Sequence, residues 1–182
     1  MVRIAPPQTG TLSPEQKKVF DDIASGPRGE VVGPLSIWLQ RPQLADRAQK
    51  LGQYCRYESS LPPRLSELAI LVTARIWDAE FEWQSHEEPA RSAGLDEQII
   101  AALAENRKPR FGREDEAVVY DVSRVLNIER TISADLYQRA ETLLGKDCLV
   151  DLIGVLGYYA LISMTIKAFD VDPIDGDNQA PA

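Results

Sequence analysis

The sequence has few of the residues that build redox and metal centres. It contains one histidine, His86, and two cysteines, Cys55 and Cys148, which are far apart and form no CxxC pair. Metal sites need several closely spaced ligands, and dithiol chemistry needs paired thiols. We therefore expect no metal site and no dithiol centre. The cysteines are expected to be small buried hydrophobic residues in a reducing cytosol.

Basic residues are also in the minority. Against 28 acidic residues stand 20 lysines and arginines, so the formal net charge is −8 and the pI is about 4.8. Nucleic-acid binding needs a basic surface, so we expect no nucleic-acid partner. A small anionic substrate would have to be held locally by a few arginines, against the overall field.

The sequence also lacks signal-peptide and membrane-anchor patterns. The N-terminus MVRIAPPQTG has no apolar core, and the longest apolar run, residues 149–169, is interrupted by Asp151 and Lys167. We expect a cytoplasmic protein that does not enter the membrane. The glycine-rich segment 26–34 lacks the lysine and Ser/Thr of a phosphate loop, which argues against a nucleotide site. We interpret it as a loop near a pocket mouth or a subunit contact.

What is present is helical patterning of a length that fits one domain. No stretch alternates with period two, and capping residues (Ser13, Asp78, Asp96, Ser133) precede apolar segments of helical period. The expected fold class is all-α, with residues 1–11 as an extension, 12–169 as one domain and 170–182 as an acidic tail that is disordered at its end. Expected helices cover residues 14–24, 35–40, 43–57, 64–76, 79–93, 96–103, 114–126, 134–144 and 146–169.

One carboxylate lies within the most apolar of these helices. Glu67 is surrounded by Leu65, Leu68, Ala69 and Ile70, and a buried carboxylate is costly unless it is paired, hydrogen-bonded or protonated. A structural ion pair with Arg64 or Arg75 accounts for this pattern. A functional carboxylate also accounts for it, and burial alone favours the ion pair.

The only histidine lies in the stretch EFEWQSHEEP. Glu82 precedes His86 by one helical turn, so both side chains share a face. Such a pair can orient an imidazole and raise its basicity, as a general base requires. On spacing alone, a surface Glu–His pair is about as consistent with the pattern as catalysis.

Together these segments resemble the carboxymuconolactone decarboxylase family, whose superfamily includes the alkylhydroperoxidase D-like proteins. The resemblance rests on PRLSELAILV, residues 63–72, followed by AEFEWQSH, residues 79–86. It is close over residues 61–95 and extends over most of residues 12–169. It implies an alkylhydroperoxidase D-like helical bundle and a homo-oligomer, in the form of a trimer, hexamer or dimer.

The peroxidase branch of that superfamily uses a glutamate, a CxxC dithiol and a histidine. Its spacing places the glutamate at Glu67 and the histidine at His86, nineteen residues later, with the thiols at Ala79 and Glu82. Both thiols are absent here, so the resemblance implies an acid/base site without a redox centre.

The family name implies loss of carbon dioxide from a carboxylated lactone. On that basis we expect a cofactor-independent lyase, or isomerase, acting on a small cyclic or aromatic-derived acid. Alternatives are residual antioxidant activity through a lone cysteine, and a non-catalytic helical oligomer that acts as a binding module. The expected catalytic residues are His86, Glu67 and Glu82, and the expected substrate-binding residues are Arg64, Trp83 and Tyr120.

Overall fold

The computed structural model describes residues 2–174, and over these residues it is helical without strands, which confirms the all-α fold class. The expected helices are present, with small changes at their ends. The elements are α1 (Pro14–Ala24), α2 (Gly33–Trp38), α3 (Pro42–Gln53), a π-helical turn (Tyr54–Glu58), α4 (Pro63–Ile76), α5 (Glu80–Ser92), α6 (Glu97–Ala104), α7 (Glu114–Ile128) and α8 (Ala134–Phe169), after a 3-10 turn at Thr9–Thr11.

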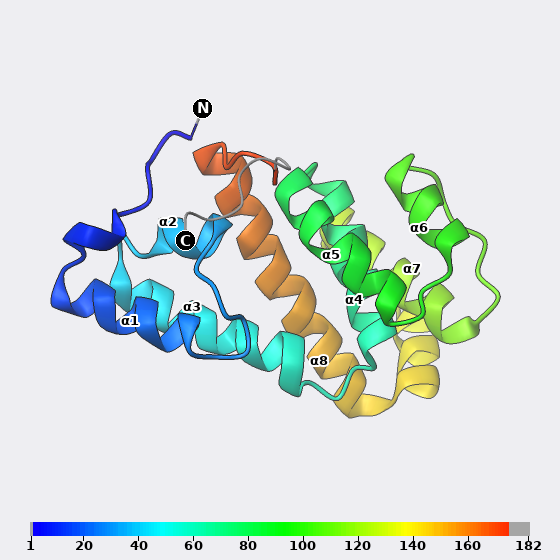
Figure 1. Ribbon diagram of the computed structural model, residues 1–182. Coiled ribbons are helices and arrows are strands. Elements are labelled where there is room, and N and C mark those ends of the chain that lie inside the picture. The colour runs from blue at the N-terminus through cyan, green and yellow to red at the C-terminus, as the bar shows by residue number, and fades with distance from the viewer. Residues whose placement is uncertain (1, 175–182) are drawn as a thin grey trace.

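Helix α8 crosses the middle of the molecule and separates two groups of helices (Figure 1). Helices α1 to α3 pack together on one side, and α4 to α7 lie on the other. Helix α4 is buried on nearly every face because it contacts α5, α7 and α8. This position explains why its sequence is apolar all round.

Three of the four expected N-caps are confirmed. Ser13 and Gln16 form a reciprocal capping box, Asp96 accepts a hydrogen bond from the Gln98 amide, and Ser133 accepts one from the Leu136 amide. The prediction for Asp78 is wrong. Its φ of 49° puts it in the left-handed region, so the chain turns there, and α5 begins one residue later behind Ala79, which has no side-chain cap.

Helix α3 does not bury the face that the sequence predicted. Ala45, Ala48 and Cys55 are buried as expected, but Leu44 and Leu51 are each 47% exposed. The buried face carries small residues, and at Gly52 the side chains of Tyr158 from α8 and of Arg28 pack directly against it. A Cβ at Gly52 would overlap the Tyr158 hydroxyl, so only glycine fits at this crossing.

Helix α8 is interrupted at Gly145, whose φ of 78° and ψ of 167° are not helical. The two expected helices on either side of this residue therefore meet at a kink. Of the described helices, α8 alone is long and apolar enough to cross a membrane, but 61% of its apolar window is buried in the fold. Its hydrophobicity is accounted for by its central position in the bundle.

The two glycines of the second half of α8, Gly154 and Gly157, differ in their surroundings within the chain. A Cβ at Gly154 would lie 4.0 Å from the Cys55 sulfur, whereas one at Gly157 would meet no atom within 4 Å. Beyond α8, the Ile174 amide donates to the Gln84 side chain at 2.6 Å. The rest of the expected acidic tail, from residue 175 on, lies outside the described residues.

Candidate active site

The structure brings together the three residues expected to be catalytic. Glu67 on α4 lies 2.6 Å from His86 Nδ1, and Glu82 on α5 lies 3.0 Å from His86 Nε2. The three residues are between 2% and 8% exposed. The i,i+4 spacing on one helix sets the Glu82 contact, and the packing of α5 on α4 sets the Glu67 contact. We call this arrangement the carboxylate clamp.

The carboxylate clamp favours a charged imidazole. Burial of the ring lowers the pKa of His86, but its hydrogen bonds to Glu67 and Glu82 outweigh that effect, and the net pKa lies above the ordinary value of 6.5. In the imidazolium form, both ring N–H groups donate to carboxylates. In the neutral form with the proton on Nδ1, the free Nε2 can take a proton from Glu82 while Nδ1–H gives its proton to Glu67.

Because His86 is the sole histidine, its charge can be followed directly by NMR. We expect its imidazole resonances to titrate above pH 6.5, and at a lower pH in Glu67→Gln and in Glu82→Gln. A raised folded pKa stabilises the protein fully below the unfolded pKa, and this stabilisation is lost as pH rises through the folded pKa. As pH rises from the unfolded to the folded pKa of His86, the free energy of unfolding of the native protein should therefore fall more steeply than that of His86→Gln. Titration at or below pH 6.5 in the native protein would contradict this assignment.

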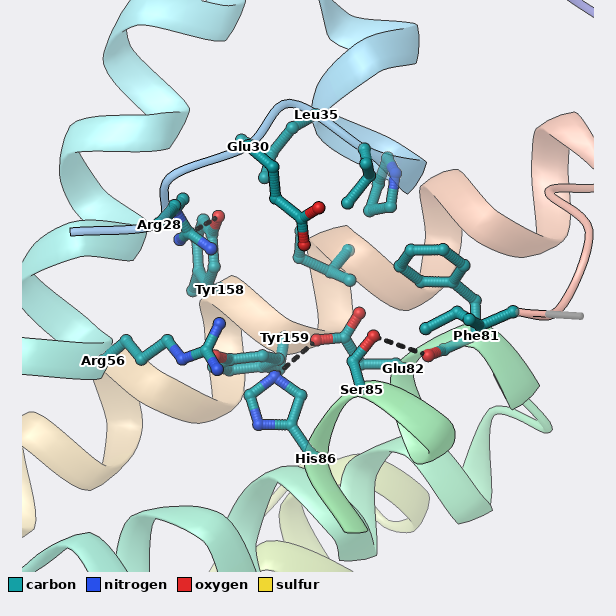
Figure 2. A pocket seen from close by; sticks show the side chains of 14 residues that line it. Arg28, Glu30, Leu35, Arg56, Phe81, Glu82, Ser85, His86, Tyr158 and Tyr159 are labelled. Atoms are coloured by element: carbon teal, nitrogen blue, oxygen red, sulfur yellow. Dashed lines mark hydrogen bonds and ion pairs between the residues drawn. The ribbon is translucent and has the colours of Figure 1, made fainter. Parts of the chain in front are cut away.

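The clamp opens on a cavity of about 190 Å³ between the two groups of helices (Figure 2). Glu82 and His86 face this space, while Glu67 is absent from its lining and holds the imidazole from behind. The His86 ring stands perpendicular to that of Tyr159, with centroids 5.1 Å apart. Burial raises the pKa of Tyr158 to about 12 and that of Tyr159 well above its usual value, so both phenols are neutral.

Two arginines that sequence reasoning missed line the same cavity. Arg28 comes from the glycine-rich loop and donates to the Tyr158 hydroxyl at 3.3 Å, and its buried Nε has no hydrogen-bond partner. Arg56 comes from the π-helical turn and extends toward His86 and Tyr159 (Figure 2). Within residues 2–174, neither guanidinium forms an ion pair with a carboxylate. The cavity thus offers two cations to an anionic ligand.

Sequence signals for these arginines were weak. The glycine-rich loop was interpreted as lying near a pocket mouth or a subunit contact, and Arg28, Glu30, Val32 and Pro34 do line the cavity. No pattern marked Arg56, because residues 43–57 read as one regular helix. The π-helical turn, closed by the bond from the Ser59 amide to the Tyr54 carbonyl at 2.9 Å, inserts an extra residue into that winding.

The structure does not bring the three expected substrate-binding residues to this cavity. Arg64 pairs with Asp115, at 2.8 Å, and with Glu116, so it neither neutralises Glu67 nor faces His86. Trp83 is buried under the Arg75 guanidinium, 4.3 Å from its ring centroid. Tyr120 packs on Phe111 and lines separate spaces near α7.

The groups of the clamp do not form a metal site. Glu67 and Glu82 bind opposite edges of the ring, so the three side chains do not converge on one point. Across residues 2–174, no group of three or more His, Cys, Asp or Glu side chains is placed to hold an ion. Cys55 is buried, and burial raises the pKa of its thiol to about 11, which disfavours the reactive thiolate.

Solved structures share this fold at low sequence identity. A peroxidase-related protein of Silicibacter sp. TM1040 has a TM-score of 0.77 and 16% identity, covering 94% of this chain and 91% of the other. An alkylhydroperoxidase AhpD core protein of Ralstonia eutropha JMP134 has a TM-score of 0.76 and 12% identity, with 96% and 93% covered. A cysteine-to-alanine variant of the debrominase Bmp8, in complex with 2,3,4-tribromopyrrole, has a TM-score of 0.75 and 13% identity, with 95% and 91% covered.

No curated protein matches the sequence significantly. The structural likenesses establish the fold alone, because identities of 12–16% do not carry an activity. The family itself rests on the sequence. Residues 42–119, which include all three residues of the carboxylate clamp, match the model of the carboxymuconolactone decarboxylase family. Over these residues the chain is similar to the carboxymuconolactone decarboxylase family, and its all-helical fold is that of AhpD-like proteins.

Proposed function

We propose that the protein is a cofactor-independent lyase or isomerase that moves a proton on a small carboxylic acid or lactone. The observation that supports this most is the carboxylate clamp, a buried Glu–His–Glu chain whose Glu82 end faces a cavity with two arginines. Acid/base catalysis needs a positioned group able to give and take protons at the reacting carbon. Substrate binding needs a local positive charge in this acidic protein.

In this proposal Arg28 and Arg56 hold a substrate carboxylate, and Glu82 and His86 face the adjacent carbon. For a lyase, the bond from that carbon to a second carboxylate breaks and carbon dioxide leaves. The electron pair stays on the carbon and takes the proton held by the Glu82–His86 pair. For an isomerase, Glu82 removes a proton from one carbon and returns it to another. The imidazolium stabilises the developing negative charge in both cases.

The test is a panel of small mono- and dicarboxylic acids and lactones, assayed for carbon dioxide release and for isomerisation. We expect Arg28→Gln and Arg56→Gln to raise KM for a responding acid by about tenfold or more, since hydrogen bonds to charged groups contribute about 1.5–3 kcal/mol. Their kcat should change much less, because these contacts exist before and during the reaction. Arg47→Gln, at an exposed position on α3, is the matched control and should leave KM unchanged. Equal KM values in the native protein and in all three variants would contradict the proposal that Arg28 and Arg56 bind the substrate carboxylate.

A thiol-based antioxidant activity is less well supported. The family position of one thiol is occupied by Glu82, which binds His86 in the clamp. Cys55 is buried, and Cys148 donates its thiol to the Ser60 carbonyl at 3.3 Å. Neither sulfur lines the His86 cavity.

The expected homo-oligomer remains a proposal, supported by the outer face of α8. Val150, Ile153 and Met164 are 47–70% exposed there, and Gly157 lies between them. An oligomer does not by itself argue against catalysis. A purely structural module gives no reason for an imidazole that is 2% exposed, clamped by two carboxylates and facing a cavity.

A further inference from the structure

A second cavity adjoins the one that holds the carboxylate clamp. Its volume is about 500 Å³, and it shares four lining residues with the inner cavity: Glu30, Val32, Phe81 and Ile174. The other lining residues are mostly apolar and come from α2, the N-terminal segment and the segment after α8, namely Val2, Pro6, Gly33, Ser36, Ile37, Val171, Asp172 and Pro173. The two cavities are thus neighbours along one wall.

Phe81 forms part of the wall that the two cavities share (Figure 2). Its ring packs directly on Gly33, where a Cβ would overlap three of the ring carbons. Gly33 also has a φ of 53°, a backbone conformation that L side chains rarely adopt. Glycine at this position therefore lets the outer end of the Phe81 ring approach α2 closely, where the ring borders both cavities.

Charge is distributed unevenly over the pair of cavities. Glu30 borders both cavities. The inner cavity also holds Glu82, which is paired with His86, together with the two cations Arg28 and Arg56. The outer cavity adds Asp172 and contains no basic residue within the described chain. A carboxylate is attracted to the inner end and repelled from the outer one. An apolar group gains by leaving water for the outer cavity.

We propose that the two cavities form one substrate site, and that the substrate is an amphipathic carboxylic acid. Its carboxylate lies between Arg28 and Arg56 beside His86, and its apolar arm passes Phe81 into the outer cavity. This inference rests on the proposed function for the inner cavity. It adds that Phe81, seated on Gly33, determines the width of the arm that the site accepts.

The experiment compares the binding of butyrate and octanoate to the full-length protein by isothermal titration calorimetry. Each methylene that enters the outer cavity should lower Kd by about fourfold, so octanoate should bind more than tenfold tighter than butyrate. Ser36→Trp and, independently, Val171→Trp fill the outer cavity. Each should remove this preference while leaving the Kd of butyrate within about twofold. Equal affinity for the two acids in the native protein, or a preference that survives both substitutions, would overturn the proposal.

A second comparison tests Phe81. Phe81→Ala removes the ring between the two cavities, so the site should accept a wider apolar group. The ratio of the Kd of 4-phenylbutyrate to the Kd of octanoate should therefore fall by at least fivefold relative to the native protein. An unchanged ratio would show that Phe81 does not set the width of the site. Circular dichroism of each variant, compared with that of the native protein, confirms that the fold is retained.

These binding results are separable from catalysis. His86→Gln should lower kcat by about 10²–10⁴-fold and keep the chain-length preference, because the apolar arm does not contact the clamp. A preference for octanoate without turnover of any acid would overturn the proposed function alone. Turnover without any chain-length preference would overturn this inference alone.

Discussion

Replacing His86 with glutamine should lower kcat for a responding acid by about 10²–10⁴-fold, the usual contribution of a positioned acid/base group. Glutamine fills a similar space but cannot carry a proton between the two carboxylates. Glu82→Gln should have a comparable effect, since Glu82 is the carboxylate of the clamp that faces the cavity. KM should change little in both variants, because Arg28 and Arg56 remain in place.

The matched control for this prediction is Glu88→Gln. Glu88 lies on the same helix as Glu82 and His86, but its side chain is 74% exposed and it binds only Arg91 and Ser92. Its loss should leave kcat unchanged. If His86→Gln kept kcat within threefold of the native protein on an identified substrate, acid/base catalysis by the clamp would have to be abandoned.

Replacing Glu67 with alanine should reduce the free energy of unfolding by about 3–5 kcal/mol at pH 6, the range expected when one member of a buried ion pair is removed. The reason is that His86, 2% exposed, would be left with an unpaired Nδ1–H. Above the folded pKa of His86 the imidazole is neutral in the native protein too. The loss should therefore shrink as pH rises through that value.

Urea denaturation at several pH values measures this effect. Glu67→Gln keeps an acceptor oxygen in the same place and should be less destabilising than Glu67→Ala. The double variant Glu67→Ala/His86→Ala completes a cycle that isolates the coupling between the two side chains. Additive losses at pH 6 would mean that the 2.6 Å contact contributes no stability of its own.

Helix positions were largely predictable because their signals are local. Ser13, Asp96 and Ser133 cap helices through hydrogen bonds to amides two or three residues away, and Gly145 breaks α8 through its own backbone angles. The prediction failed where a tertiary contact decides. Leu44 and Leu51 follow the helical period but are exposed, because the α3–α8 crossing admits only small residues such as Gly52.

In the candidate site too, contacts within one helix were predictable, whereas contacts between distant segments were not. Sequence by itself determined that Glu82 and His86 share one helix face, because 3.6 residues per turn place positions i and i+4 together. The apolar helix around Glu67 marked that carboxylate as unusual, and the family resemblance linked it to His86, where the packing of α5 on α4 brings it to Nδ1. Arg64 showed the limit of such reasoning, since its guanidinium turns to Asp115 and Glu116 on α7.

Only the tertiary structure decided which cations face His86. Arg28 lies in a loop and Arg56 in a π-helical turn, both distant in sequence from α5, and no periodic pattern relates them to it. They reach the cavity because the α1–α3 group packs on the side of α8 that faces away from α4–α7. There the Tyr158 ring packs on Gly52, and its hydroxyl accepts a hydrogen bond from Arg28. Local geometry sets contacts within a helix, whereas contacts between distant segments depend on how whole helices pack.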